Sequence, residues 1–502
     1  MTSMNNINLV DDKWIPVIQK DTGFGYASLS EIFSNGTEIV DISADTLERI
    51  SLMRLLICIA EASLVCSEKV DSFKNAKDCL SELAITYLQK WKYKFNLFDE
   101  KYPFLQVRDA DGEKPKSVSY LNFYEASSQT RNFINNKPCS ENLSLHQIVL
   151  KLLVFQNFDT GGALGRFKWA NNFTADNSQG LGGKDSICTA QNALHAFVIK
   201  SNIIETIIAN LVEPVELKNG IRIDKQELGL PHWHLELTSQ TTPTETITNN
   251  TKTFLGRLVP LCRAIKLLDN ENIYSGCGLI YESFPDYHEF TCTFLHNDKK
   301  GESILRSNIN KDIWRSLQSL LANYQTNNKH AKVPYALYSI SREAFTLWVG
   351  GIATENKNIL KTIESSFHIP YTGENNIRLD NAIKAYSKAV SDAEKIEILI
   401  GKAINKYKEL ICTCTNHKSR IGEKAKPQYW SILEKHQKIL MKLFDANYEI
   451  ESVLKEWNQI CKVSAEKSFA NTCPHQTPRL LIAFMQARNE LFKQPKNKNE
   501  KR

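Results

Sequence analysis

After Pro370 the apolar residues recur every three or four positions, and this change of pattern constrains the fold more than any other feature. Such spacing places apolar side chains on one face of a helix. The pattern predicts helices over residues 383–410, 429–444, 450–469 and 479–492. Pro427 and Pro474 stand in the breaks, where a missing amide proton is tolerated. Four amphipathic helices with short connections predict an antiparallel four-helix bundle over residues 371–495, followed by a charged tail at 496–502.

The first 370 residues mix the periods of strands and helices. Strand-like alternation occurs at residues 14–18, 233–237 and 345–349. Helical spacing occurs at residues 46–66, 74–90, 145–155 and 203–212. A chain of 502 residues is too long for one ordinary domain. We therefore predict an α+β protein in which a large mixed α/β domain, residues 1–370, precedes the bundle.

The sequence predicts neither membrane insertion nor export. The longest uninterrupted apolar stretches, such as residues 55–60, are far shorter than the roughly 20 residues of a membrane-spanning helix. Residues 1–12 are polar, with neither a basic region nor an apolar core, so they do not resemble a secretion signal. We expect a cytoplasmic protein with no membrane partner.

Basic residues are concentrated in the predicted bundle. From Tyr371 onward, 24 Lys and Arg stand against 15 Asp and Glu, a net charge of +9; because the whole chain carries +6, the first 370 residues carry −3. A basic region beside a nearly neutral body favours a polyanionic partner. Lys402, Lys406 and Lys408 are candidates for sequence-independent DNA contacts. A solvated helical surface explains the same charges at least as well.

The sequence contains no catalytic signature. Neither a GxSxG nucleophile elbow nor an HExxH zinc helix occurs. Residues 180–184 (GLGGK) faintly resemble a phosphate-binding loop, but Asp185 replaces the Ser or Thr that such a loop requires. We therefore expect neither an enzyme nor a bound cofactor.

Two groups of residues have the side chains of a zinc site. The larger group comprises Cys412, Cys414, His417, Cys473 and His475. Its spacing matches no strong ligand signature, so ordinary buried thiols are favoured. His232 and His234 would share one face of a strand, but without a third ligand nearby ordinary packing is favoured. We expect no bound metal.

Three polar segments are suited to contact rather than catalysis. The first, GGALGRFKW at residues 161–169, follows an apolar helix. Its glycines let a backbone approach a ligand closely, while Arg166 and Lys168 could meet phosphates and the two aromatic rings could stack. A helix end followed by a flexible loop is the alternative, although it leaves the basic and aromatic alternation unexplained.

The second segment, GGIATENKN at residues 350–358, connects a predicted strand to a helical pattern at residues 359–367. Asn358 is a plausible N-cap, so Asn356 and Lys357 would lie just before a helix N-terminus, where backbone donors favour anions. An ordinary capping loop is equally compatible. The third segment, residues 129–138, contains one aromatic residue, Phe133, and by itself indicates only an exposed loop.

Taken in order, these segments resemble a known family. Residues 8–17 (NLVDDKWIPV) resemble the start of the large subunit (CasA) of the type I-E CRISPR Cascade complex. Residues 98–106 (FDEKYPFLQ) are similar to the "aspartate … hydrophobic-Pro-Phe-hydrophobic-Gln" segment of that family. The Phe133 segment, the glycine loop and the segment at residues 350–358 follow in the same order and at similar spacing, and a basic bundle closes the chain.

The resemblance implies a non-catalytic subunit of an RNA-guided antiviral complex. In this family the large α/β domain lies beside the 5′ end of the guide RNA and reads the protospacer-adjacent motif (PAM) of target double-stranded DNA, largely from the minor groove. It starts duplex opening for R-loop formation and helps to recruit the helicase–nuclease. The implied partners are the guide CRISPR RNA, the other Cascade subunits, the target DNA and that helicase–nuclease.

The resemblance also implies roles for individual residues in DNA binding. Gly161 and Gly162 would belong to a glycine loop that touches the PAM duplex. Asn356 would be a wedge between the strands, flanked by Glu355, Lys357 and Asn358. The best-known relatives have glutamine at the wedge, which is one methylene longer than asparagine.

The family also uses a lysine on a hairpin near the middle of the chain, for which Lys266 is the candidate. Phe133, with Arg131 and Asn135, would contact the 5′ handle of the guide and neighbouring subunits. Two alternatives stay open. One is a stand-alone nucleic-acid-processing enzyme with an unrecognised site, and the other is a purely structural scaffold.

Overall fold

The structure is a computed structural model of the chain. It describes residues 7–67, 73–108, 111–112, 114–122, 143–161, 167–169, 173–175, 185–214, 227–235, 243–284, 287–297, 301–321, 331–338, 344–355, 358–370, 376–411 and 420–493. The chain divides into two compact units. The first unit comprises residues 1–313, 323–340 and 346–366, and the second comprises residues 314–322, 341–345 and 367–502.

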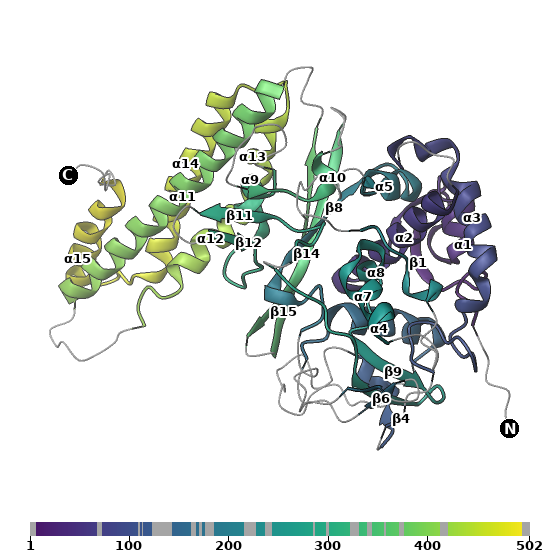
Figure 1. The fold of residues 1–502 in the computed structure, drawn as a ribbon. Helices are drawn as coiled ribbons and strands as arrows, with labels where there is room; N and C mark the ends of the chain where they lie inside the picture. Colours follow the sequence, from purple (N-terminus) through teal and green to yellow (C-terminus); the bar gives the residue numbers. More distant parts are fainter. Residues whose placement is uncertain are drawn as a thin grey trace. The chain divides into compact units, whose positions relative to one another are not determined.

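Helix α2 (Thr46–Ser67) is the core helix of the first unit (Figure 1). Its side chains are buried around the whole circumference from Ile50 to Leu64, which is the pattern of a helix enclosed by protein. The helices that pack against it are α3 (Leu80–Trp91), α4 (Leu145–Phe158), α5 (Ile203–Ala209) and α8 (Phe254–Leu258). Further helices of this unit are α1 (Leu29–Ser34), α7 (Pro243–Lys252) and α10 (Tyr335–Tyr338).

Within the described part of the chain, one helix is long and apolar enough to cross a membrane, and it is α2. However, 83% of its most apolar window is buried inside the protein. Packing within the core therefore accounts for its composition. Arg54 and Glu61 are the charged residues that limit the uninterrupted apolar stretch to residues 55–60, and both are fully buried.

The strands form five three-stranded sheets in the described residues, with the orders β2-β1-β3, β5-β10-β9, β12-β11-β13, β15-β14-β8 and β4-β6-β7. Their bounds are β1 Ile15–Gln19, β2 Gly23–Ala27, β3 Ile39–Ile42, β4 Asp111–Gly112, β5 Lys116–Ser117, β6 Phe167–Trp169, β7 Phe173–Ala175, β8 Leu194–Ile199, β9 Arg263–Leu267, β10 Asn272–Cys277, β11 Phe294–Asn297, β12 Gly301–Ile304, β13 Ala331–Lys332, β14 Phe345–Glu355 and β15 Asn358–Ile369. Small sheets beside a helical core make an α+β architecture, so the predicted fold class is confirmed.

The prediction of a helix at residues 359–367 is wrong, because β15 occupies this stretch. Ile359, Ile363 and Phe367 are four positions apart, a spacing that satisfies both the strand period of two and, approximately, the helix period of 3.6. Asn358 is therefore the first residue of a strand rather than an N-cap. The helix predicted for residues 74–90 begins only at Leu80, because a 3₁₀ turn occupies Phe73–Asp78.

The predicted strand at residues 233–237 is also wrong, because His232–His234 forms a 3₁₀ turn directly after Pro231. Trp233 is buried and its indole Nε1 donates to the hydroxyl of Tyr87 at 2.7 Å. The His234 ring stacks on Trp91 with the ring centres 4.0 Å apart. His232 and His234 therefore serve the aromatic core and do not share the face of a strand.

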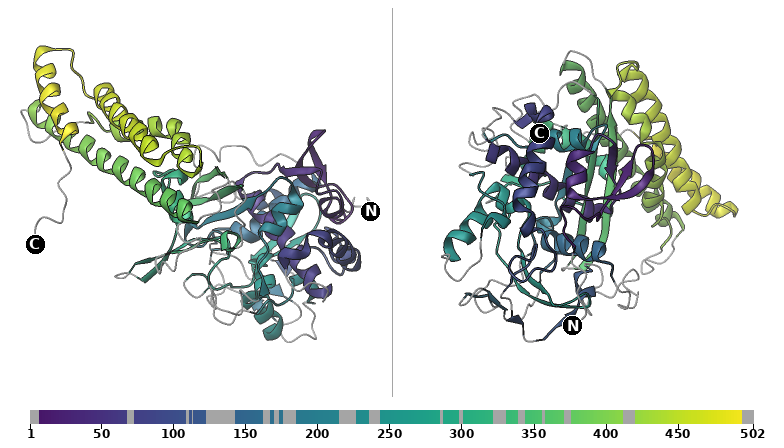
Figure 2. Two further views of the ribbon diagram at one scale, coloured as in Figure 1. Left: turned by 90° about the horizontal axis from the view of Figure 1, so that it is seen from above. Right: turned by 90° about the vertical axis from the view of Figure 1, so that its right-hand side faces the viewer.

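The second unit is built around the long helix α11 (Asn376–Ile411). The helices that pack with it are α12 (Ala425–His436), α14 (Ile450–Thr472) and α15 (Pro478–Arg488), and the short α13 (Lys438–Met441) follows α12. Both views of Figure 2 show α11, in green, running alongside the yellow α14. Hydrogen bonds reinforce the contact, since Trp457 Nε1 donates to the carbonyl of Ala389 at 3.2 Å.

An earlier segment of the chain contributes to this bundle core, which the sequence pattern did not indicate. Trp314, just before α9 (Leu317–Leu321), is fully buried between Trp430 and Trp457, with ring centres 5.9 and 5.8 Å away. Its carbonyl accepts a hydrogen bond of 2.9 Å from the hydroxyl of Tyr386. The helical core of the second unit is thus completed by residues far from it in sequence.

Candidate nucleic-acid interface

The glycine loop leaves α4 at a well-defined point. A capping box starts this helix: Ser144 Oγ accepts from Gln147 N at 3.3 Å, and Gln147 Oε1 accepts from Ser144 N at 2.9 Å. Asp159 ends the helix, and its amide donates to the carbonyl of Phe155 at 3.2 Å. Gly161 then adopts φ +69°, a left-handed conformation that favours glycine. The backbone at the start of the loop therefore requires the glycine that the sequence analysis singled out.

A buried ion pair fixes the same point. The guanidinium of Arg263, the first residue of β9, pairs with the carboxylate of Asp159, and both side chains are almost completely buried. Burial alone would lower the pKa of Arg263, but the negative charge of Asp159 raises it. The pair therefore keeps its charges and attaches the root of the glycine loop to the β9–β10 hairpin.

Lys266 lies on this β9–β10 hairpin, directly opposite Tyr274. Its neighbours Ile265 and Leu267 are buried, so the alternation of a strand directs Lys266 to the other face of the sheet, where it is half-buried. A hairpin lysine near the middle of the chain is what the family resemblance implied.

The hairpin of β14 and β15 carries the proposed wedge segment. Gly350 and Gly351 lie inside β14, paired with β8, so the loop predicted for residues 350–358 is wrong for residues 350–355, which belong to the strand. A Cβ on Gly350 would lie 2.5 Å from the Trp348 ring, and a Cβ on Gly351 would lie 2.6 Å from the carbonyl oxygen of Ala193. Close packing within a sheet, rather than loop conformation, requires these glycines.

One short segment is hydrogen-bonded both to the end of α4, where the glycine loop begins, and to the end of β14. This bracket segment comprises residues 186–193. At its start, Ser186 N donates to the carbonyl of Asp159 at 2.9 Å, and Cys188 N donates to that of Asn157 at 3.0 Å. At its end, Asn192 hydrogen-bonds to Thr354, the residue before the last of β14. The two segments predicted to touch DNA are therefore anchored to the same piece of backbone.

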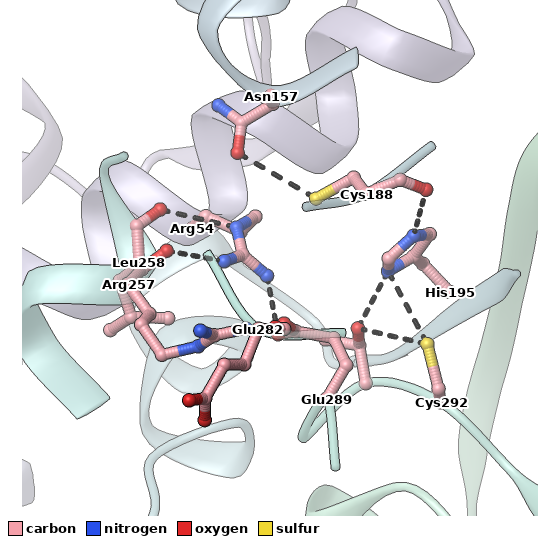
Figure 3. A network of polar contacts seen from close by, with 10 residues as sticks. Arg54, Asn157, Cys188, His195, Arg257, Leu258, Glu282, Glu289 and Cys292 are labelled. Atoms are coloured by element: carbon pink, nitrogen blue, oxygen red, sulfur yellow. Dashed lines mark hydrogen bonds and ion pairs between the residues drawn. The ribbon is translucent and has the colours of Figure 1, made fainter. Parts of the chain in front are cut away.

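A buried polar network is hydrogen-bonded to the bracket segment (Figure 3). His195 Nε2 donates to the carbonyl of Cys188 at 3.0 Å, and Nδ1 accepts from the hydroxyl of Thr291 at 2.7 Å. Burial lowers the pKa of His195 to about 4, so the imidazole is neutral at pH 7. A neutral ring with one donor and one acceptor satisfies both of these partners.

The other half of the network in Figure 3 centres on Arg54 of the core helix α2. Its guanidinium donates to Glu289 at 2.5 Å and to the carbonyls of Arg257 and Leu258 at 2.7 and 3.1 Å. Burial alone would raise the pKa of Glu289, but the positive charges of Arg54 and Arg257 lower it. Both ends of the buried pair are thus charged and compensated.

Cys292 and His195 are the pair in this network that most resembles a nucleophile and its base, with Sγ and Nδ1 3.7 Å apart. A neutral imidazole that is already hydrogen-bonded to Thr291 and to a backbone carbonyl is poorly placed to take a proton from the thiol. The adjoining cavity is only about 20 Å³ in volume, which is room for one water molecule. The network is therefore structural.

The basic residues singled out on the bundle all lie on α11. Lys402 is exposed, and Lys406 forms an ion pair with Glu409 at 3.4 Å. Lys402 and Lys406 are one helical turn apart and share a face, whereas Lys408 lies about 200° around the helix from Lys406. The three lysines therefore do not form a single stripe.

Several predicted contacts lie outside the residues that the structure describes. These are Arg131, Phe133, Asn135, Gly162, Arg166, Asn356 and Lys357, and also the zinc candidates Cys412, Cys414 and His417. Lys168 lies in β6 and Asn358 begins β15, but their side chains also fall outside the described part. Of the remaining zinc candidates, Cys473 is buried, and the ring of His475 packs at a tilt against Phe484 with the ring centres 4.7 Å apart. No group of three metal-ligating side chains occurs among the residues described.

Sequence reasoning missed the residues that anchor the two segments predicted to contact DNA. Asp159 stands beside the predicted Gly161, so a charged residue at the end of an apolar helix was a usable signal. Arg263 and Asn192 gave no comparable signal, because their partners lie 104 and 162 residues away in sequence.

A comparison with known families identifies the family of this chain. The family model described as CRISPR-associated protein Cse1 matches residues 8–467. The chain belongs to the Cse1 family. The family suggested by the sequence resemblance is thereby confirmed.

A curated relative of this Cse1-family chain is CRISPR-associated protein CasA/Cse1 of Thermus thermophilus. The two sequences are 26% identical over 342 residues, and the alignment covers 64% of this chain and 61% of the relative. The aligned region thus spans less than two thirds of the relative's length.

Solved structures share the fold over nearly the whole length of the Cse1-family chain. Thermobifida fusca Cse1 superposes with a TM-score of 0.74 at 16% identity, covering 98% of each chain. Thermus thermophilus CasA (Cse1) gives 0.71 at 18% identity, covering 97% of this chain and 99% of that one. A chain of a CRISPR RNA-guided surveillance complex gives 0.70 at 14% identity, covering 97% and 100%.

Proposed function

We propose that this protein is the non-catalytic large subunit of an RNA-guided CRISPR surveillance complex of the Cascade type, which recognises the PAM of invading double-stranded DNA. In this role it starts the opening of the duplex for R-loop formation and helps to recruit the helicase–nuclease. The observation that carries the proposal is the bracket segment, which ties the root of the glycine loop and the end of the β14–β15 hairpin to one support. Because the glycine loop and the hairpin end are attached to the same segment, both can act on one short duplex.

The proposed partners follow from the family. They are the guide CRISPR RNA, the other subunits of the complex, target double-stranded DNA and the helicase–nuclease, all in the cytoplasm. A structural relative comes from a CRISPR RNA-guided surveillance complex, which supports the RNA and subunit partners. Base pairing with the guide would supply most of the sequence specificity, so the protein needs to read only a few base pairs.

We assign the DNA contacts by segment. Gly161 and Gly162 let the backbone approach the minor groove, and the ammonium group of Lys266 suits a phosphate or a base edge. Asn356 enters between the strands at the hairpin end, with Lys357 and Asn358 beside it. Minor-groove readout is degenerate, so we expect tolerance of several PAM sequences.

Three further groups of contacts complete the proposal. Phe133, Arg131 and Asn135 contact the 5′ handle of the guide and neighbouring subunits. Arg166 and Lys168 follow the backbone phosphates of the duplex. Lys402, Lys406 and Lys408 make sequence-independent contacts that weaken as salt rises.

A double substitution at the hairpin end tests the function. In the complex assembled with guide RNA, Asn356→Ala with Lys357→Ala should slow strand separation of a target duplex, reported by a fluorescent base analogue next to the PAM. Binding to the same target with a pre-opened bubble should be retained, because a wedge acts only on paired strands. Lys361→Ala is the matched control, since Lys361 is an exposed lysine further along β15. A normal opening rate in the double variant would support the scaffold alternative instead.

A further inference from the structure

Asn192 has a backbone conformation that demands an explanation. It adopts φ +55°, directly after Gln191 at φ +58°. Two consecutive non-glycine residues in the left-handed region are unusual, although asparagine tolerates this region better than most residues. Such conformations persist only where surrounding contacts enforce them, and they often mark functional positions.

The side chain of Asn192 forms hydrogen bonds with both the carbonyl and the amide of Thr354. Its Nδ2 donates to the carbonyl of Thr354 at 3.0 Å, and its Oδ1 accepts from the amide of Thr354 at 3.2 Å. The hydroxyl of Thr354 donates to the same Oδ1 at 2.7 Å. The amide group thereby copies the donor and acceptor pair of a neighbouring strand.

This contact replaces strand pairing where the sheet ends. The register of β8 and β14 runs from Thr346 opposite Ile199 to Gly351 opposite Leu194, and no further pair follows in the described residues. The left-handed turn carries the backbone of the bracket segment away from β14 at this point. The Asn192 side chain reaches back and holds β14 beyond the last regular pair.

The backbone of Asn192 is held in place by Ser307. Its carbonyl accepts from the amide of Ser307 at 2.8 Å, and the hydroxyl of Ser307 donates to the carbonyl of Ile352 at 2.5 Å. The clamp is therefore part of a closed set of hydrogen bonds rather than a single exposed contact. Thr354 is followed in β14 only by Glu355, so the clamp acts on the end of the strand.

We propose that Asn192 is the positioning residue of this protein for duplex opening, because its side-chain clamp on Thr354 holds the end of β14 rigidly on the support that also carries the glycine loop. The proposal rests on the proposed function of the hairpin end. A wedge can separate paired strands only if the duplex cannot push it aside, and the clamp resists that displacement. Asn192 itself touches no DNA in this scheme.

Asn192→Gly is the sharpest test, because glycine accepts the left-handed backbone and removes only the clamp. In the complex assembled with guide RNA, we expect duplex opening to slow about tenfold or more, since three hydrogen bonds are removed. The target is a duplex whose flanking sequence is selected from a randomised library for binding to the parent complex. Affinity for the pre-opened target should stay unchanged, which a general loss of structure would not allow.

Two further variants separate positioning from stability. Thr354→Val removes one of the three hydrogen bonds and should slow opening by a smaller factor, whereas Thr354→Ser keeps the hydroxyl and should match the parent. Gln191→Gly is the matched control, because Gln191 has the same backbone conformation but bonds to Phe284 and Arg306 rather than to β14. Hydrogen exchange of the Thr354 amide should accelerate in Asn192→Gly and not in Gln191→Gly.

The outcomes distinguish this inference from the proposed function. If Asn192→Gly opens the duplex at the parent rate while the Asn356 and Lys357 double variant is slow, the clamp has no positioning role and the wedge stands. If neither variant is slow, the proposed function fails and the inference fails with it. Should Asn192→Gly not assemble, unchanged opening in Thr354→Val would overturn the inference.

Discussion

Three histidines, of which His195 is fully buried and His232 and His234 are half-buried, should make the first unit lose stability as the pH falls from 7 to 5. Burial lowers the pKa of His195 to about 4, that of His232 to about 3 and that of His234 to about 4. In the unfolded chain each imidazole has a pKa near 6.5. The unfolded state therefore binds more protons below pH 6.5, and the stability that these groups contribute is lost between pH 6.5 and the folded values.

The size of the effect follows from the pKa difference. A pH of 5 lies about 1.5 units below the pKa of an unfolded imidazole. At about 1.4 kcal/mol per unit, the free energy of unfolding falls by about 2 kcal/mol for a fully buried histidine. His195 alone costs about 2 kcal/mol, and the half-buried His232 and His234 each add less because solvent screens them. Such a loss is a large share of the stability of an ordinary domain.

Hydrogen exchange of the α2 amides at pH 7 and pH 5 measures this loss, because α2 lies in the same unit and exchanges through its unfolding. His195→Gln should reduce the difference between the two pH values by about 2 kcal/mol, since glutamine does not titrate. His436→Gln, which replaces an exposed histidine of the second unit, is the control. An unchanged pH difference in His195→Gln would refute the reasoning that this imidazole is held neutral.

Two other predictions concern charge. Reversing Lys402 and Lys406 to Glu should lower the affinity of the complex for DNA of any sequence. The slope of log affinity against log salt concentration should become shallower by up to about 0.9 for each phosphate that is no longer neutralised. Reversing Lys455 and Lys462, two exposed lysines of α14, to Glu is the same charge change and should leave that slope unaltered. An equal change in both variants would mean that only net charge matters. Asp159→Asn should cost about 3 kcal/mol of stability in exchange experiments on α4, because Arg263 loses its buried counter-charge. A destabilisation below about 1 kcal/mol would show that Arg263 is compensated without Asp159.

Much of the architecture was predictable because it depends on local periodicity. The apolar residues that became α14 recur at helical spacing, and the structure places a helix there. The strand pattern before Gly350 likewise became β14. The errors fell where the sequence is ambiguous, as at residues 359–367, where apolar residues four apart fit a strand and a helix equally.

The candidate site was predictable only in part. Gly161 could be singled out, because a glycine after an apolar helix indicates a left-handed backbone, and the structure has φ +69° there. The family order supplied Lys266, which does lie on a hairpin. Neither argument could find the support that these segments share, since Asn192 and Arg263 look like ordinary polar residues in the sequence.

By itself, therefore, the amino-acid sequence determined the helices and strands whose side-chain spacing is unambiguous, the change to a helical unit after Pro370 and the family. Only the tertiary structure decided which distant residues meet: Trp314 with the bundle core, Asp159 with Arg263, and Asn192 with Thr354. The physical reason is that local spacing fixes which face of an element is apolar, whereas a hydrogen bond between residues far apart in the chain depends on how all the elements between them pack.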